Sequence, residues 1–137
     1  MSISITRGEK TLYQALSSNS KVTSTVGTKI KRNSAKGAAP PYVIWQFQGG
    51  RGLKIVGGIR LWDDLDFIVK AVCEGESLAP IETTAEGIQE ALEDKQFTID
   101  GRLVSTFVSD PITYEETDPD NPKAKYQHLG WRVLIRA

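Results

Sequence analysis

The sequence is poor in the residues from which active sites and covalent cross-links are commonly built. Among its 137 residues there is one cysteine, Cys73, and one histidine, His128. A single cysteine excludes a disulfide within the chain, and neither residue has a partner at a standard metal-ligand spacing. No apolar run is long enough to cross a bilayer, and the N-terminal segment lacks the apolar block of a signal peptide. We therefore expect a soluble protein of a reducing compartment, with no metal, no cofactor and no membrane contact.

The remaining candidates for chemistry are weak. Asp63, Asp64 and Asp66 form a carboxylate cluster of the kind that binds Mg²⁺, but no second acidic motif accompanies it, so a solvated strand end is favoured. Cys73 falls on the apolar face of a predicted strand, where a free cysteine is usually a core residue rather than a nucleophile. The glycines around Arg51 precede a hairpin pattern, not the helix that a phosphate-binding loop requires. We predict no catalytic residue and no enzymatic activity.

Acidic residues are almost absent from the first 62 residues. This half has ten Lys or Arg and one acid, Glu9, whereas residues 63–137 have seven bases and sixteen acids, so the halves carry +9 and −9. Such asymmetry can mark a nucleic-acid surface on the basic half. It can equally mark complementary faces, within one fold or between copies of it, or charges that only keep the chain soluble.

Apolar spacing predicts three helices and four strands. Thr6 and Glu9 form a capping box that predicts the start of a helix over 7–17, and Gly27 ends a short helix that carries Val22 and Val26. Alternation predicts strands over 42–48, 65–73, 98–109 and 126–137, and the stripe that repeats every three to four residues over 78–92 predicts a long helix. The polar, proline-containing segment 114–125 is predicted to be a loop.

This order predicts one α+β domain over residues 1–137. Two hairpins with a helix between them, preceded by an N-terminal helix, give an antiparallel four-stranded sheet with both helices packed on one face. On the last strand, Leu129, Trp131, Val133 and Ile135 are expected to face inward, and His128 outward.

The glycine-rich segment 48–60 is predicted to be an assembly loop and is the strongest candidate for an interaction site. Its five glycines lower the cost of a conformational change on docking, and Leu53, Ile55 and Val56 offer apolar area that a partner can cover. We expect its basic residues to meet acids of the second half across a subunit boundary. The predicted donors are Arg51, Lys54 and Arg60, and the predicted acceptors are Glu115, Glu116, Asp118 and Asp120.

Several segments, taken in order, resemble a known family. A helix at 12–16 leads into the valine- and glycine-containing segment 22–30, and a strand follows Pro40, Pro41 and Tyr42. Segments 56–62, 69–72, 78–92 and 129–135 continue the pattern. Together they resemble the tail-completion, or tail-terminator, proteins of long-tailed bacteriophages.

The resemblance implies a mixed sheet with flanking helices and a hexameric ring at the head-proximal end of the tail tube. The implied partners are further copies of the chain, the tail tube protein and a neck or connector protein, with DNA only passing through the ring lumen. The implied location is the virion, after assembly in the host cytoplasm. The alternative function is a nucleic-acid-binding module that uses the basic N-terminal half.

Overall fold

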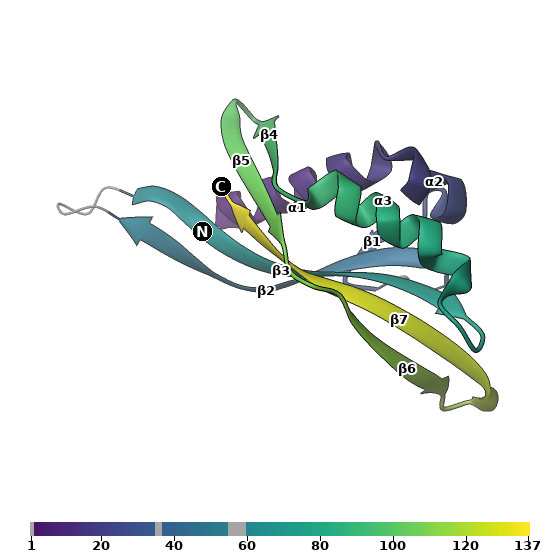
Figure 1. Ribbon diagram of the computed structural model, residues 1–137. Helices are drawn as coiled ribbons and strands as arrows, with labels where there is room; N and C mark the ends of the chain where they lie inside the picture. Colours follow the sequence, from purple (N-terminus) through teal and green to yellow (C-terminus); the bar gives the residue numbers. More distant parts are fainter. Residues whose placement is uncertain (1, 35–36, 55–59) are drawn as a thin grey trace.

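The computed structural model describes residues 2–34, 37–54 and 60–137, and within them the chain forms three α-helices and one seven-stranded sheet (Figure 1). The helices are α1 (Ser2–Ser17), α2 (Ser20–Val26) and α3 (Glu82–Leu92), and a short 3₁₀ turn, Ala79–Ile81, precedes α3. The strands are β1 (Ile30–Arg32), β2 (Tyr42–Lys54), β3 (Arg60–Glu74), β4 (Lys95–Ile99), β5 (Arg102–Val108), β6 (Ile112–Asp118) and β7 (Asn121–Arg136).

Strand β7 organises the sheet. The strand order is β1-β2-β3-β7-β5-β4, and β6 also pairs with β7. On one edge β7 pairs with β3 from Asp64↔Arg136 to Glu74↔Tyr126. On the other edge β5 pairs with the C-terminal end of β7 and β6 pairs with its N-terminal part. All pairs are antiparallel except β1 with β2.

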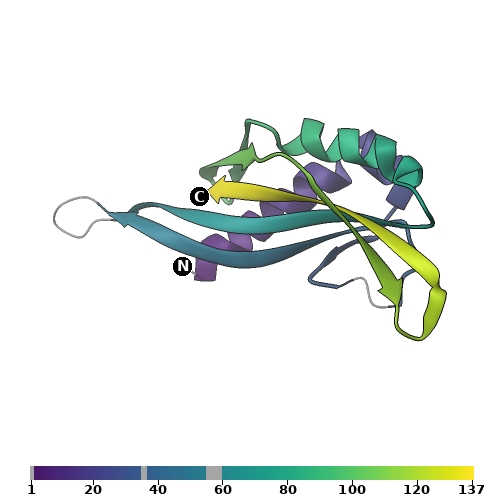
Figure 2. The same cartoon turned by 60° about the horizontal axis from the view of Figure 1, so that its bottom comes forward.

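The three helices cover one face of the sheet (Figures 1 and 2). The predicted inward faces are confirmed, because alternate residues of β2, β3 and β7 lie in one core with the apolar stripes of the helices. Helix α1 lies close to β3, where a Cβ on Gly8 would come within 3.0 Å of the Phe67 ring. The large fully buried side chains include Leu12, Leu16, Leu65, Phe67, Ile88, Leu92, Trp131 and Ile135.

The expected sheet of four strands is wrong, and the α+β class with helices on one face is correct. The predicted strand over 98–109 is a hairpin, with β4 and β5 joined at Asp100 and Gly101. Both residues have positive φ, 52° and 77°, as the type I′ turn of a two-residue hairpin requires. The Asp-Gly dipeptide is the signal for this turn, and it lies inside an apolar pattern that conceals it.

The predicted loop over 114–125 is also a hairpin. Strands β6 and β7 pair from Ile112↔Gly130 to Asp118↔Asn121, and every side chain of β6 except the half-buried Asp118 is exposed. Pairing between main chains needs no apolar side chains when water covers both faces, so polar composition did not exclude a strand here. Strand β2 likewise continues six residues beyond the predicted end, to Lys54, through three glycines.

The N-terminal capping box is wrong, whereas the second helix is confirmed. Helix α1 begins at Ser2, so Thr6 lies inside it. The Glu9 carboxylate instead accepts hydrogen bonds from Trp45 Nε1, at 3.0 Å, and from Arg32 Nε. Helix α2 ends at Gly27, with φ of 60°, as the glycine predicted.

Helices α2 and α3 approach each other closely at Gly87. A Cβ at this position would lie 2.7 Å from Asn19 Oδ1 and 2.9 Å from Val22 Cγ2. Asn19 cannot simply turn away, because its side chain accepts from the backbone N–H groups of Lys21 and Val22 and so caps α2. The glycine therefore sets the distance between the two helices.

We predict that Gly87→Ala lowers the free energy of unfolding by about 1–3 kcal/mol, because the added methyl group overpacks this contact. The sign of this change separates a close contact from an open one, since replacing glycine by alanine at an open helical position raises the free energy of unfolding by up to about 1 kcal/mol. Urea unfolding measures the change. The exposed Gln89→Ala on the same helix is the control and should change stability by less than about 0.5 kcal/mol. A more stable Gly87→Ala variant would refute the close contact.

Candidate interaction surface

The predicted donors lie on a long arm formed by β2 and β3. Arg51 is exposed and stands opposite Asp64 in the strand register, and Leu53 and Lys54 stand opposite Trp62 and Arg60. Ile55 and Val56 lie outside the described residues. The expectation of a loop over 48–60 is therefore wrong for 48–54 and for Arg60, which are strand.

The predicted acceptors lie on the hairpin of β6 and β7, at the opposite end of the molecule from the arm (Figure 1). Glu115, Glu116 and Asp118 belong to β6, and Asp120 lies in the turn that follows. The structure thus gathers each set at one end and keeps the two sets apart, so contacts between them would have to join different copies. Their local partners are Gln127 for Glu115, at 2.8 Å, His128 for Glu116, at 2.9 Å, and the backbone N–H of Asp120 for Asp118, at 2.9 Å.

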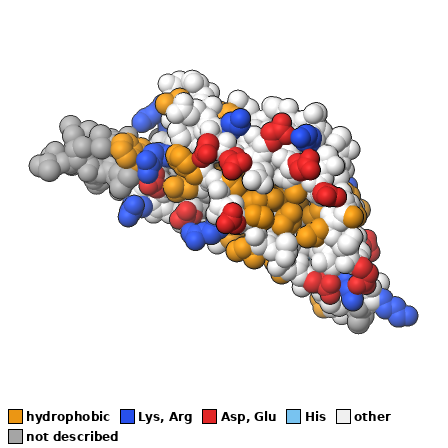
Figure 3. All heavy atoms as spheres, viewed as in Figure 1, with side chains coloured by type: hydrophobic (Ala, Val, Ile, Leu, Met, Phe, Trp, Pro, Cys, Tyr) orange, Lys and Arg blue, Asp and Glu red, His pale blue; other side chains and the backbone are white. Residues whose placement is uncertain are grey.

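An apolar groove of about 390 Å³ lies between the start of α3 and β7. Leu78, Ala79, Ala85 and Leu129 supply its apolar walls, and Glu82 adds one carboxylate. Figure 3 shows hydrophobic side chains gathered below α3, with acidic side chains above them. Sequence analysis assigned Leu78, Ala85 and Leu129 to the core and so missed the groove, although Leu78 and Ala85 are only half-buried.

His128 is on the face of the sheet away from the helices, as predicted, but it is not exposed. Its residue exposure is 7%, because the Tyr114 ring of β6 stacks on it at 4.3 Å and 11°. The Tyr114 hydroxyl accepts a hydrogen bond from Lys70 Nζ at 3.1 Å. The buried Val72 is paired with His128 in the register of β3 and β7. His128 therefore helps to seal the base of the β6–β7 hairpin.

Burial lowers the pKa of His128, and the Lys70 ammonium lowers it further, while the Glu116 carboxylate opposes both. The unfolded chain takes up a proton near the ordinary value of 6.5, whereas the folded chain takes it up only at lower pH. Below that value, protonation therefore favours the unfolded state, and this contribution to stability is lost as the pH falls from 6.5 through the folded pKa.

We predict that His128→Gln flattens the dependence of stability on pH below 6.5. Urea unfolding of both proteins between about pH 7.5 and about pH 5 measures it, and the difference between the proteins removes contributions from the carboxylates they share. Wild type should lose more stability than the variant over this range. Parallel curves would show that His128 is not held neutral by the fold.

The carboxylate cluster and the cysteine are structural. Asp63 is buried rather than solvated, and its carboxylate accepts a hydrogen bond from the Ser4 hydroxyl. The backbone N–H and C=O groups of Asp63 pair with those of Ala137, at 2.7 and 2.9 Å. Asp64 accepts two hydrogen bonds from Arg136, at 2.8 and 3.2 Å. Arg132 lies 3.9 Å from Asp66. The predicted solvated strand end is therefore wrong at Asp63. No three acidic, cysteine or histidine side chains in the described part of the chain are grouped so as to hold a metal ion.

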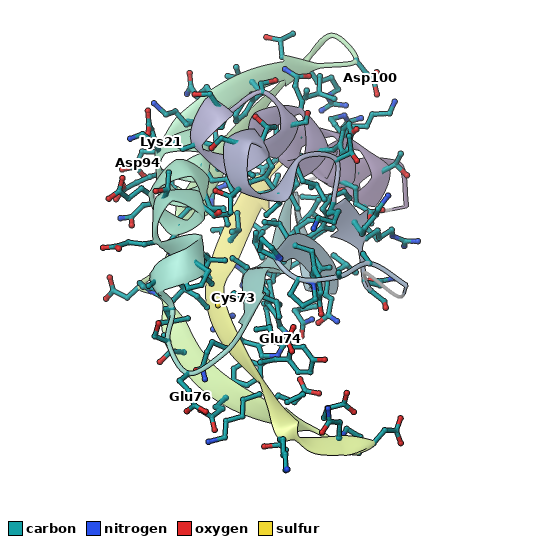
Figure 4. The ribbon with its side chains drawn as sticks, turned by 90° about the vertical axis from the view of Figure 1, so that its right-hand side faces the viewer. Lys21, Cys73, Glu74, Glu76, Asp94 and Asp100 are labelled. Carbon is teal, nitrogen blue, oxygen red and sulfur yellow. The ribbon has the colours of Figure 1, made fainter. Side chains whose placement is uncertain are left out.

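Cys73 belongs to the core, as predicted (Figure 4). Its thiol is directed at the backbone oxygen of Ser77, at 3.4 Å, and burial raises the pKa of the thiol. A raised pKa keeps the sulfur protonated at neutral pH, which disfavours its use as a nucleophile.

Comparison with known proteins identifies a family. The family model described as "Tail completion protein gp17" matches residues 10–127. No curated protein matches the chain. A chain in a solved structure, "Virion of native gene transfer agent (GTA) particle", is 18% identical, with a TM-score of 0.62 over 92% of each chain. At that identity the likeness shows the fold alone.

None of the helices in the described ranges is long and apolar enough to span a membrane.

Proposed function

Because this chain belongs to the family of tail completion protein gp17, and so is a structural protein of a phage-type tail, we propose that it forms a closed ring at the head-proximal end of the tail tube. The ring ends tube growth and joins the tail to the neck. Its work is binding, and it needs no catalytic group.

The observation that carries the ring is the separation of opposite charges. The basic arm and the acidic hairpin occupy opposite ends of one elongated subunit (Figures 1 and 2). A head-to-tail contact joins unlike surfaces, and such contacts repeat from copy to copy and close into a ring when the rotation between neighbours divides a full turn. An antiparallel two-fold dimer would also pair each arm with the hairpin of the other copy, so the number of subunits in the assembly is the measurement that separates a ring from a dimer.

The proposed partners follow from the place of the ring. Further copies of the chain bind through the arm, the tail tube protein lies below the ring and a neck or connector protein lies above it. DNA only passes through the lumen. The proposed interface residues are Arg51, Leu53, Lys54, Ile55, Val56 and Arg60 on one side, and Glu115, Glu116, Asp118 and Asp120 on the other.

We predict that the purified protein forms a cyclic oligomer, a hexamer, alone or on the ends of tail tubes. Native mass spectrometry gives the subunit number, and electron microscopy of tubes shows the ring. Assembly should slow as salt rises past a few tenths molar, where the screening length falls to about 3–6 Å, because exposed charge pairs set association rate more than affinity.

Arg51→Glu combined with Lys54→Glu should slow assembly further. The alternative, nucleic-acid binding through the basic half, predicts that the same change abolishes DNA retention and leaves the oligomer intact. A monomer at high concentration that also fails to form rings on tube ends would contradict the proposed function.

A further inference from the structure

We propose that the apolar groove between α3 and β7 is the receptor for the β2–β3 arm of a neighbouring copy of this chain. This inference rests on the proposed ring and specifies which surface receives the arm.

The groove is an apolar surface that the subunit does not cover. The hairpin of β6 and β7 bends away from the helices (Figure 1). The start of α3 therefore does not close over this part of β7, and the groove between them stays open. Leu78 and Ala85 remain half-buried and Ala79 is exposed. Covering such a surface removes apolar area from water, which favours an occupant with apolar side chains on an extended backbone.

One carboxylate in the groove has no basic partner among the residues that the structure describes. Glu82 lines the groove and makes no ion pair or side-chain hydrogen bond with any residue that the structure describes. Its neighbours on either side are paired. Lys21 lies 2.9 Å from Glu90 and 3.9 Å from Glu86, and Lys125 lies 3.4 Å from Glu76. A basic side chain that enters the groove would therefore meet an available acid.

The arm carries basic residues that complement this carboxylate. Arg51 is exposed and forms no ion pair within the described ranges, because Asp64, opposite it in the register, accepts hydrogen bonds from Nε and Nη2 of Arg136. Lys54 and Arg60 lie farther along the same arm. The arm extends past the helix layer at the end of the molecule opposite the groove (Figures 1 and 2), so it cannot fill the groove of its own chain.

The β6–β7 hairpin of a neighbour fits the groove less well. Its exposed residues include three acids, Glu115, Glu116 and Asp120, against one base, Lys123, so it would bring net like charge to Glu82. The arm of a second copy is the occupant that matches the groove in charge and reach, and its docking continues head-to-tail around a ring.

Charge reversal on each side tests the contact. Glu82→Lys and Arg51→Glu should each raise the protein concentration needed for half-assembly by roughly tenfold or more, and the double variant should recover at least part of that loss. Glu93→Lys is the control, because it makes the same charge change at the C-cap of α3, outside the groove lining. Sedimentation measures assembly, and circular dichroism with thermal unfolding verifies that each variant is folded.

A cross-link provides a test that does not depend on loss of assembly. In a Cys73→Ala background, which removes the native thiol, Arg51→Cys with Glu82→Cys should form covalent multimers under mild oxidation. Arg51→Cys with Glu93→Cys should not. If wild type assembles while both reversals behave like Glu93→Lys and neither cysteine pair cross-links, the groove is not the receptor although the ring stands. If wild type does not assemble even on tube ends, the proposed function fails instead.

Discussion

The antiparallel pairing of β3 with β7 is the constraint on which the rest of the structure depends. These strands have 15 and 16 residues, and at about 3.3 Å per residue each spans roughly 50 Å. Helices α1 and α3 have 16 and 11 residues, and at about 1.5 Å per residue they span only about 24 and 16 Å. The helices therefore cover the middle of the sheet and leave both of its ends projecting.

The projecting ends give the subunit its function in this account. One end is the basic β2–β3 arm, and the other is the acidic β6–β7 hairpin beside the groove at α3 (Figure 1). The close contacts at Gly8 and Gly87 set the spacing between α1 and β3 and between α2 and α3. The proposed head-to-tail ring needs unlike surfaces at a fixed separation, and a long central strand pair under a short helix layer would provide them.

Local pattern predicted the buried faces well, because alternation on β3 and spacing on α3 directly reflect burial. It failed where the pattern of apolar and polar side chains does not indicate the backbone conformation. The exposed strand β6 is as polar as a loop, and the turn at Asp100 and Gly101 lies between two short alternating segments that were predicted as one strand. The segregation of charge was visible in the sequence, and Arg51 and Glu115 were named from it. The groove was not visible, because Ala85 and Leu129 are distant in sequence and the gap between them depends on how far β7 extends beyond α3.

The central claim is that subunits join through two unlike ends, and mixing two singly blocked variants tests it most directly. An Arg51→Glu chain retains its groove, and an Ala85→Gln chain, whose larger side chain fills the groove, retains its arm. The account predicts that each variant alone needs a protein concentration roughly tenfold or more above that of wild type to assemble. Below that concentration, native mass spectrometry of the mixture should show one-to-one dimers that grow no further, since only one intact arm meets one intact groove. A mixture that stays monomeric, or that assembles into full rings, would contradict it.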